Sequence, residues 1–175
     1  RKSKGLIIVI TGNGKGKTSA AMGVLACASG RDLSVGVIQF IKSPELSYGE
    51  AITAKRLNIP FQSVEDRFVF KSGGQADSRE DALSAWAEAQ RWICSREYDL
   101  LILDEITYLF HFGWLDVNEV IAWIKQNKPM GMHLVMTGRY APAELIEYAD
   151  LVTEMQEIKH PFKEQKIPAQ MGIDY

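Results

Sequence analysis

The residues best suited to chemistry stand near the amino terminus, in a run rich in glycine and lysine. Residues 11–18 are Thr-Gly-Asn-Gly-Lys-Gly-Lys-Thr. Glycines let backbone N–H groups approach an anion unobstructed by side chains, and the lysines add positive charge. Lys17 has the position that neutralises outer phosphates, and Thr18 has that of an Mg²⁺ ligand. The run predicts a nucleoside triphosphate site, with Lys17 at the loop surface, formed by Gly12, Asn13, Gly14, Lys15, Gly16, Lys17 and Thr18.

This run departs from the usual phosphate-loop pattern at one position. The pattern G-x-x-x-x-G-K-[ST] would place a glycine at position 11, where this sequence has Thr11. With Gly12 as its first glycine, the loop is one residue short. The alternative is a tight strand-to-helix turn without a ligand, but so many glycines and lysines in so few residues are hard to explain that way.

Two carboxylates follow a strongly apolar strand further along the chain. Leu100–Leu103 is wholly apolar, and Asp104 and Glu105 come directly after it. Ligands of parallel α/β sheets bind at the carboxyl ends of the strands, so these acids are candidate Mg²⁺ ligands beside the glycine-rich loop. Arg139, which follows the expected strand 133–137, would reach a phosphate at the same edge. The structural alternatives are a helix-capping acid pair and a surface arginine.

Alternating strands and helices are expected to position these groups. We expect strands at 6–10, 34–41, 61–64, 100–103, 133–137 and 151–158, and helices at 18–29, within 44–59, and at 77–96, 116–126 and 142–149. The strands are continuously apolar, which is typical of a parallel sheet covered by helices on both faces. The pattern therefore predicts one α/β domain over residues 1–175, with 66–75 a loop and the last residues an irregular tail. For the helix 77–96 we expect a buried stripe formed by Leu83, Trp86, Ala87, Gln90 and Ile93.

Composition excludes several classes of protein. The chain has 175 residues, 46% of them hydrophobic, and a net charge of -2 from 20 bases and 22 acids. This balance argues against an electrostatic nucleic-acid binder, a polybasic membrane binder and a disordered chain, and no apolar run approaches membrane-spanning length. Cys27 and Cys94 form no disulfide framework, which favours reduced thiols in the cytoplasm. The scattered His111, His133 and His160 are expected to be structural, and no Ser-His-Asp or Cys-His arrangement stands out.

Several segments together resemble the P-loop-type corrinoid adenosyltransferases, the ATP:cob(I)alamin adenosyltransferases. They are residues 11–18, Val37-Ile-Gln-Phe-Ile-Lys42, Leu103-Asp-Glu-Ile-Thr-Tyr108, Thr137-Gly-Arg139 and Ala169-Gln-Met-Gly-Ile-Asp-Tyr175. The altered phosphate loop is the form that this family uses. The resemblance implies a three-layer P-loop NTPase-like (RecA-like) fold with a mainly parallel sheet.

The resemblance also implies an activity. Family members transfer the 5′-deoxyadenosyl group of ATP to Co(I) of a corrinoid and release triphosphate, with Mg²⁺ or Mn²⁺ as cofactor. It assigns catalytic roles to Lys17, Thr18 and Glu105, and gives Glu105 the direct metal contact. Phe68 and Phe70 match the aromatic pair that lies against the corrin, although the family often has tryptophan at the second position. A homodimer and a reductant protein such as a flavodoxin are implied as well.

Two other functions stay open at this stage. One is a different P-loop kinase or hydrolase, which would release ADP. The other is a regulator that binds ATP without turnover. The terminal Gln-Met-Gly-Ile-Asp-Tyr motif and the altered loop weigh against both.

Overall fold

The fold is a parallel sheet with helices on both faces, seen in a computed structural model that describes residues 4–41, 49–63 and 75–173. The strands are β1 (Ile7–Thr11), β2 (Val35–Gln39), β3 (Phe61–Ser63), β4 (Leu100–Asp104), β5 (His133–Thr137) and β6 (Leu151–Glu154). The helices are α1 (Lys17–Ser29), α2 (Gly49–Arg56), α3 (Gln75–Ser95), α4 (Thr107–His111), α5 (Val117–Asn127), α6 (Ala143–Tyr148) and α7 (Pro161–Gln165).

All six strands run parallel, in the order β3-β2-β4-β5-β1-β6. Every residue of β1, β2 and β4 is buried, as their continuous apolar sequences predicted. Because parallel strands end at one edge, β1, β2, β4 and β5 deliver their carboxyl ends to the same side of the molecule.

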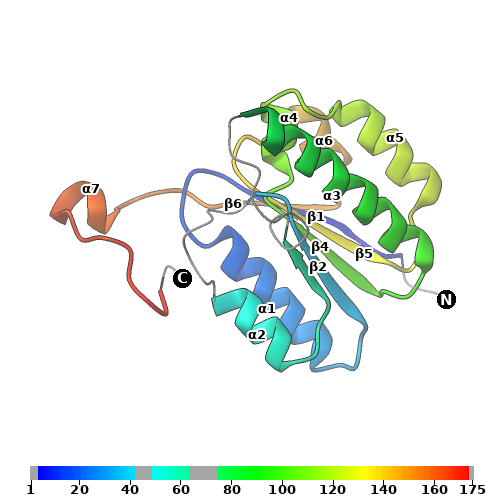
Figure 1. The fold of residues 1–175 in the computed structure, drawn as a ribbon, viewed down its shortest axis with the longest axis horizontal. Helices are drawn as coiled ribbons and strands as arrows, with labels where there is room; N and C mark the ends of the chain where they lie inside the picture. Colours follow the sequence, from blue (N-terminus) through cyan, green and yellow to red (C-terminus); the bar gives the residue numbers. More distant parts are fainter. Residues whose placement is uncertain (1–3, 42–48, 64–74, 174–175) are drawn as a thin grey trace.

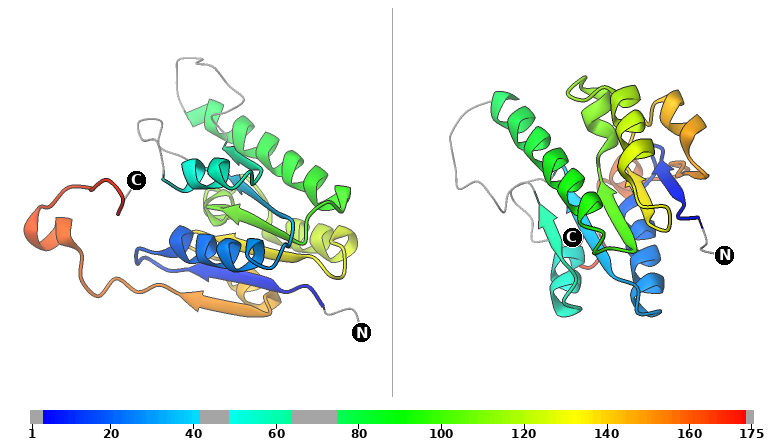
Figure 2. Two further views of the ribbon diagram at one scale, coloured as in Figure 1. Left: turned by 90° about the horizontal axis from the view of Figure 1, so that it is seen from below. Right: turned by 90° about the vertical axis from the view of Figure 1, so that its right-hand side faces the viewer.

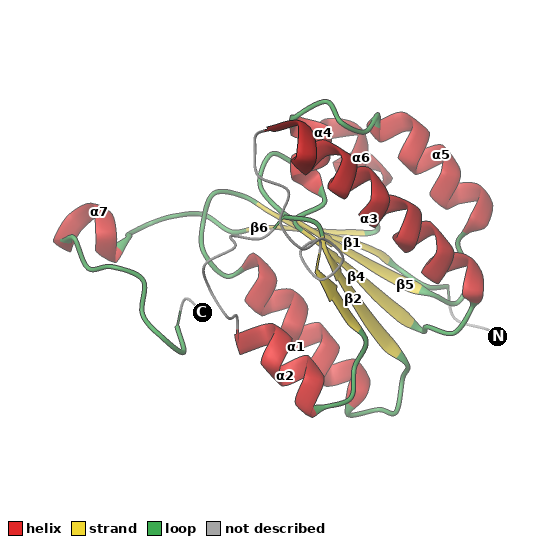
Figure 3. Ribbon diagram, in the orientation of Figure 1, coloured by secondary structure: helices red, strands yellow, loops and turns green. Residues whose placement is uncertain are grey.

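Helices form a layer on each side of the sheet (Figure 1). Alternate residues of β1 divide between the two layers, because successive strand side chains point to opposite faces. Ile8 and Ile10 pack with Ala21 and Leu25 of α1 in one apolar cluster. Ile7 and Val9 belong to a second cluster, shared with α3, α5 and α6, and Figure 3 shows these helices together on the face opposite α1 and α2. The predicted three-layer α/β fold is therefore confirmed.

One expected element ends earlier than predicted, and two observed helices were not expected. The last strand ends at Glu154 rather than at Ile158, because Glu154 pairs with Thr11, where β1 itself ends and offers no further partner. The two shortest helices, α4 and α7, were not expected. Proline at the first position of α7 is compatible with a helix start. A backbone N–H at that position has no acceptor within the helix, so proline, which has no N–H, loses no hydrogen bond there.

The buried stripe of α3 is displaced from the expected one. Trp86 and Ile93 are buried as predicted, but Ala87 is exposed, and Leu83 and Gln90 are only half-buried. Small residues take their places, since Ala82, Ala85 and Ala89 are the ones packed in the core. At the amino end of α5, Asp116 is the cap, and its carboxylate accepts from the backbone N–H groups of Asn118 and Glu119.

Beyond β6 the chain forms an arm, residues 155–173, that leaves the body and turns back toward α1 and α2 (Figures 1 and 2). Its large apolar side chains are mostly exposed, among them Ile158, Phe162, Met171 and Ile173. Within the described residues, no helix has the length and apolar character needed to cross a membrane.

Candidate functional site

The glycine-rich loop links β1 to α1 in a backbone conformation that only glycine adopts easily. Gly12 and Gly16 have φ angles of 99° and 111°, in the left-handed region. Gly14 lies against the arm, where an added Cβ would come within 2.7 Å of backbone atoms of Met155 and Gln156. The Gly14 N–H donates to the Met155 carbonyl at 2.7 Å, so the arm fixes the loop from behind.

Thr11 explains why the loop begins one residue late. It is the last residue of β1, it is buried, and it pairs with Glu154 of β6. Its hydroxyl accepts from the backbone N–H of Ala141 at 3.3 Å, which ties the loop after β5 to the end of β1. The position that usually carries glycine is therefore part of the sheet here, and it has a structural task.

The sequence predicted Lys17 at the loop surface, and this prediction is wrong. Its side chain folds back into the loop with 7% exposure, and its ammonium group donates to the Gly14 carbonyl at 2.8 Å. Burial lowers the pKa of Lys17 from its ordinary value, the negative charges of Glu105 and Asp104 oppose that shift, and Arg139 adds to it. The cation is thus held in place before any phosphate arrives.

Asp104 lies at the centre of a buried hydrogen-bond cluster at the ends of three strands. Its Oδ1 accepts from the hydroxyls of Thr18 at 3.0 Å and Thr137 at 2.6 Å, and its Oδ2 accepts from Nε2 of Gln39 at 2.9 Å. Asp104 is fully buried, and these donors offset the cost of burying its charge. Thr137 also accepts from the Glu105 backbone N–H at 3.0 Å, so one hydroxyl orients both acids.

Glu105 is strained and poorly solvated. Its φ angle is 63°, which is unusual for a residue with a side chain. Its Oε2 is buried and has no hydrogen-bond partner among the described residues. The pKa of Glu105 is raised to about 7, mainly by burial and also by the neighbouring Asp104 charge, while the positive charges of Lys17 and Arg139 oppose the rise. Strain and an unsatisfied carboxylate oxygen in one residue are typical of a functional group.

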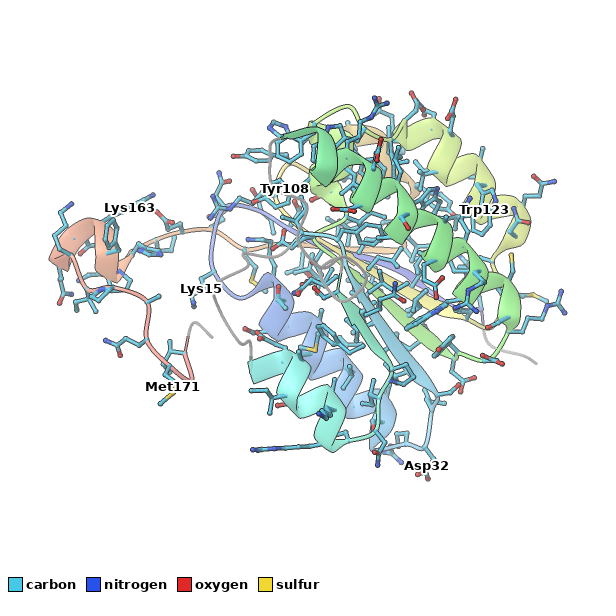
Figure 4. The ribbon with its side chains drawn as sticks, in the orientation of Figure 1. Lys15, Asp32, Tyr108, Trp123, Lys163 and Met171 are labelled. Carbon is cyan, nitrogen blue, oxygen red and sulfur yellow. The ribbon has the colours of Figure 1, made fainter. Side chains whose placement is uncertain are left out.

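These residues surround a cavity of about 350 Å³ at the carboxyl edge of the sheet. The structure brings together the predicted lining residues Asn13, Gly14, Lys15, Gly16, Lys17, Thr18, Asp104, Glu105 and Arg139. Gly12 is the exception, because it packs against the Met155 carbonyl behind the loop. Figure 4 labels Lys15 on the loop and Tyr108 on α4, which both line the cavity. Phe68 and Phe70 lie outside the described residues.

Sequence reasoning missed several lining residues. Gln39 and Tyr108 stand inside the quoted motifs, so their polar or aromatic character at a strand end or in a short helix was a usable signal. The arm supplies Glu157, His160 and Ile173. Ile173 stands inside the quoted terminal motif, but nothing local in the sequence indicates that Glu157 and His160 reach the cavity. His160 also has the structural role expected of it, because its Nδ1 accepts from the Phe162 N–H at the start of α7.

Aromatic rings extend from the cavity over the surface of α4. Tyr108 stacks with Phe112 at a centroid distance of 5.8 Å and meets Tyr140 edge-on at 5.9 Å. His111 stacks on Tyr140 at 4.1 Å, and Trp114 lies beside Phe112. Phe112 and Tyr140 are each 50% exposed, so the group presents apolar faces to solvent next to the cavity.

The donor set fits a hard divalent cation. Mg²⁺ prefers oxygen ligands, uses one or two carboxylates, and keeps several waters. The cavity offers three groups whose oxygen atoms can bind a metal ion: the Thr18 hydroxyl, the Asp104 carboxylate and the unpartnered Oε2 of Glu105. Among the described residues, no group of three or more His, Cys, Asp and Glu side chains is arranged to hold a metal.

Known proteins are similar in sequence to this chain over nearly its whole length. The model of the family "ATP:corrinoid adenosyltransferase BtuR/CobO/CobP" matches residues 3–175. A corrinoid adenosyltransferase of Sinorhizobium sp. is 37% identical over 174 residues, which is 98% of this chain and 81% of that protein. The corrinoid adenosyltransferase CobA of Salmonella typhimurium is 34% identical over 175 residues, which is all of this chain and 88% of that one.

A solved structure supports the fold alone. The flagellar accessory protein FlaH of Methanocaldococcus jannaschii superposes with a TM-score of 0.56 at 14% identity, over 86% of this chain and 71% of that one. Family membership rests on the sequence matches. This chain belongs to the ATP:corrinoid adenosyltransferases, and it is an enzyme that adenosylates corrinoids.

Proposed function

We propose that the enzyme transfers the 5′-deoxyadenosyl group of ATP to Co(I) of a corrinoid, either cobalamin or a precursor, and releases triphosphate. A Co–C5′ bond forms with the electron pair of Co(I), and the C5′–O5′ bond breaks with its pair leaving on triphosphate. One observation carries this proposal beyond family membership: the loop, two acids and Arg139 line one cavity at the sheet edge.

The chain's own residues bind and stabilise the triphosphate. Lys17, Arg139 and the N–H groups at the start of α1 offset its negative charge, which grows as the C5′–O5′ bond breaks. Thr18, Asp104 and Glu105 would hold Mg²⁺ or Mn²⁺, and the ion would supply further charge neutralisation on the phosphates. The buried position of Lys17 places its charge before the substrate arrives, so little reorganisation is needed during the reaction.

The proposed chemistry needs none of the nucleophilic arrangements, Ser-His-Asp or Cys-His, for which the sequence offers no clear candidate. Because Co(I) is the attacking group, the protein needs no activated Ser, Cys or His. Its contribution is to hold C5′ of the nucleotide close to cobalt in an aligned geometry, and this proximity accounts for much of the rate enhancement in such reactions.

The corrin requires an apolar surface beside the phosphate cavity. The half-buried ring of Tyr108 and the exposed rings of Phe112 and Tyr140 form one, and they favour a large planar macrocycle at this edge. The proposal also includes Phe68 and Phe70 as a wall against the corrin that displaces the lower axial ligand of cobalt. Truncating them should slow turnover from Co(II) with a reductant more than turnover from prereduced Co(I).

The proposal extends to the cellular setting of the reaction. We expect a homodimer that receives electrons from a reductant protein such as a flavodoxin and that has no nucleic-acid partner. A cytoplasmic location agrees with Cys27 and Cys94, which are both free thiols at the surface.

Product analysis tests the proposal directly. The enzyme is incubated with ATP, Mg²⁺ and chemically reduced cobalamin, and products are separated by chromatography. Triphosphate and adenosylated corrinoid in equal amounts are expected, with neither formed when corrinoid is omitted. ADP with phosphate would instead identify a kinase or hydrolase, and ATP binding without turnover would identify a regulator.

A further inference from the structure

Gln39 is a buried polar side chain that lines the cavity, and among the described residues only the nitrogen of its amide has a hydrogen-bond partner. It is the last residue of β2, where it pairs directly with Asp104, the last residue of β4. Its side chain is 7% exposed and lines the cavity. The rest of β2 is Val-Gly-Val-Ile, so one amide ends an otherwise apolar strand. A buried amide destabilises a fold unless its polar atoms find partners.

The chemistry of Asp104 determines how this amide is oriented. An ionised carboxylate only accepts hydrogen bonds, so the amide must direct its NH₂ group toward Asp104. Nε2 accordingly donates to Oδ2 at 2.9 Å, while both threonine hydroxyls donate to Oδ1. The amide oxygen must then be the other atom, and Oε1 is buried without a hydrogen-bond partner among the residues described.

An unpartnered buried oxygen beside a ligand cavity indicates a donor supplied by the ligand. Three acceptors meet at this edge of the sheet: Oε1 of Gln39, the carboxylate of Asp104 and the unpartnered Oε2 of Glu105. A magnesium ion keeps several waters when it binds to one or two carboxylates, and those waters donate strong hydrogen bonds. A metal-bound water therefore matches the missing donor.

We propose that Gln39 is a positioning residue of the cation site, with Nε2 orienting Asp104 and Oε1 accepting a hydrogen bond from a water on the cation. This inference rests on the proposed function only for the identity of the cation. Groups that orient metal ligands typically change metal affinity tenfold to a hundredfold when they are removed.

The test measures metal binding in the absence of corrinoid, so that no turnover occurs. Mn²⁺ is titrated into the full-length protein with saturating ATP, and free Mn²⁺ is followed by electron paramagnetic resonance. Gln39→Met keeps the length of the side chain but removes both polar atoms. We expect it to weaken Mn²⁺ binding tenfold to a hundredfold, while ATP binding in EDTA is unchanged. The matched control is Gln62→Met on β3, a half-buried glutamine outside the cavity lining, which should leave both unchanged.

Two results would overturn the inference. Unchanged Mn²⁺ affinity in a folded Gln39→Met variant would show that Oε1 has no part in the cation site. An equal loss of ATP binding in EDTA would show that Gln39 contacts the nucleotide instead.

A second variant covers the case in which Gln39→Met does not fold. Gln39→Glu keeps the shape and places a second carboxylate against Asp104, so its melting temperature in EDTA should fall below that of the wild type. Mn²⁺ should close that gap, and a loss that Mn²⁺ does not restore would count against the proposal. If these metal effects appear but the product assay yields no adenosylated corrinoid, only the proposed function fails.

Discussion

The ammonium group of Lys17 donates to the carbonyl of Gly14, a residue of its own loop, and is shielded from water. Replacing this lysine therefore removes the proposed phosphate contact and also leaves a loop carbonyl without its donor. Both effects follow from the loss of the ammonium group, and Lys17→Met, which keeps most of the apolar stem, adds less loss of packing than Lys17→Ala does.

We expect Lys17→Met to weaken ATP binding about tenfold to a hundredfold, because a hydrogen bond to a charged group contributes about 1.5–3 kcal/mol. Calorimetric titration of ATP measures the loss. Lys55→Met, at an exposed position of α2, is the control and should bind as the wild type does. If a folded Lys17→Met variant bound ATP with wild-type affinity, Lys17 would not be part of the ATP site.

Asp104 and Glu105 are adjacent acids with different surroundings. Replacing each by its amide should therefore affect different properties, the stability for one and the metal requirement for the other. Three donors occupy the oxygens of Asp104, whereas Oε2 of Glu105 has no partner among the described residues. Asp104→Asn should lower the stability more, by about 1–3 kcal/mol, because its new NH₂ group meets donors. Glu105→Gln should raise the Mg²⁺ concentration needed for half-maximal rate more. Melting curves and Mg²⁺ titrations of both variants test this, and a larger metal effect in Asp104→Asn would reverse the assignment.

The raised pKa of Glu105 predicts a pH dependence of stability in the metal-free protein. Because the folded-state pKa is about 7 and the ordinary value is 4.5, the folded protein holds this proton more tightly than the unfolded chain does. The contribution to stability is complete below about pH 4.5 and is lost as the pH rises to about 7, by about 3 kcal/mol in all.

The difference in unfolding free energy between Glu105→Gln and the wild type isolates this effect from other titrating groups. In urea denaturation in EDTA, the unfolding free energy of the variant minus that of the wild type should rise by about 2–3 kcal/mol between pH 5 and pH 8. A difference that is equal at both pH values would show that Glu105 titrates normally.

At the scale of single elements, the strand ends determine the site. Gly138, directly after β5, has a φ of 134°, and an added Cβ would lie 2.1 Å from the Thr107 hydroxyl and 3.1 Å from Oε2 of Glu105. Thr107 in turn donates to the Arg139 carbonyl at 2.5 Å. A side chain at position 138 would therefore displace α4 and Glu105 together.

Gly138→Ala should lower the unfolding free energy by about 1–3 kcal/mol, through backbone strain and this clash, and should weaken metal binding. Gly23→Ala provides a control of opposite sign. Gly23 lies inside α1 with no neighbouring atom within 4 Å of an added Cβ, so alanine should stabilise the helix by about 0.5–1 kcal/mol. Thermal melting of both variants checks the two signs, and a stabilised Gly138→Ala would refute the packing argument.

The sequence predicted those parts of the fold and site that depend on local pattern. Continuous apolar runs identified the strands, and the glycines of the loop have the positive φ angles or close contacts that their type suggested. Gln39 was missed because its role comes from its register with Asp104, which is 65 residues away. The stripe on α3 was misplaced because alanines face the sheet, and because Glu88 is buried with its carboxylate paired to Arg91 and Trp92.

At the scale of the whole molecule, we propose that residues 1–175 unfold as one domain. The two apolar clusters lie on opposite faces of one sheet, and β1 contributes alternate residues to each. Neither helix layer can keep its core if the sheet separates, so thermal unfolding should be a single transition. Differential scanning calorimetry should give equal calorimetric and van't Hoff enthalpies, and two resolved transitions would contradict the proposal.

The position of β1 between β5 and β6 has a consequence for synthesis of the protein. β1 pairs with β5 and β6, which leave the ribosome long after it, and the backbone of Gly14 is fixed by Met155. Such long-range pairings form late, because the intervening chain must be ordered first. The glycine-rich loop, although translated well before β5 and β6, is therefore completed only after they have emerged, and we expect the nascent protein to bind ATP only then.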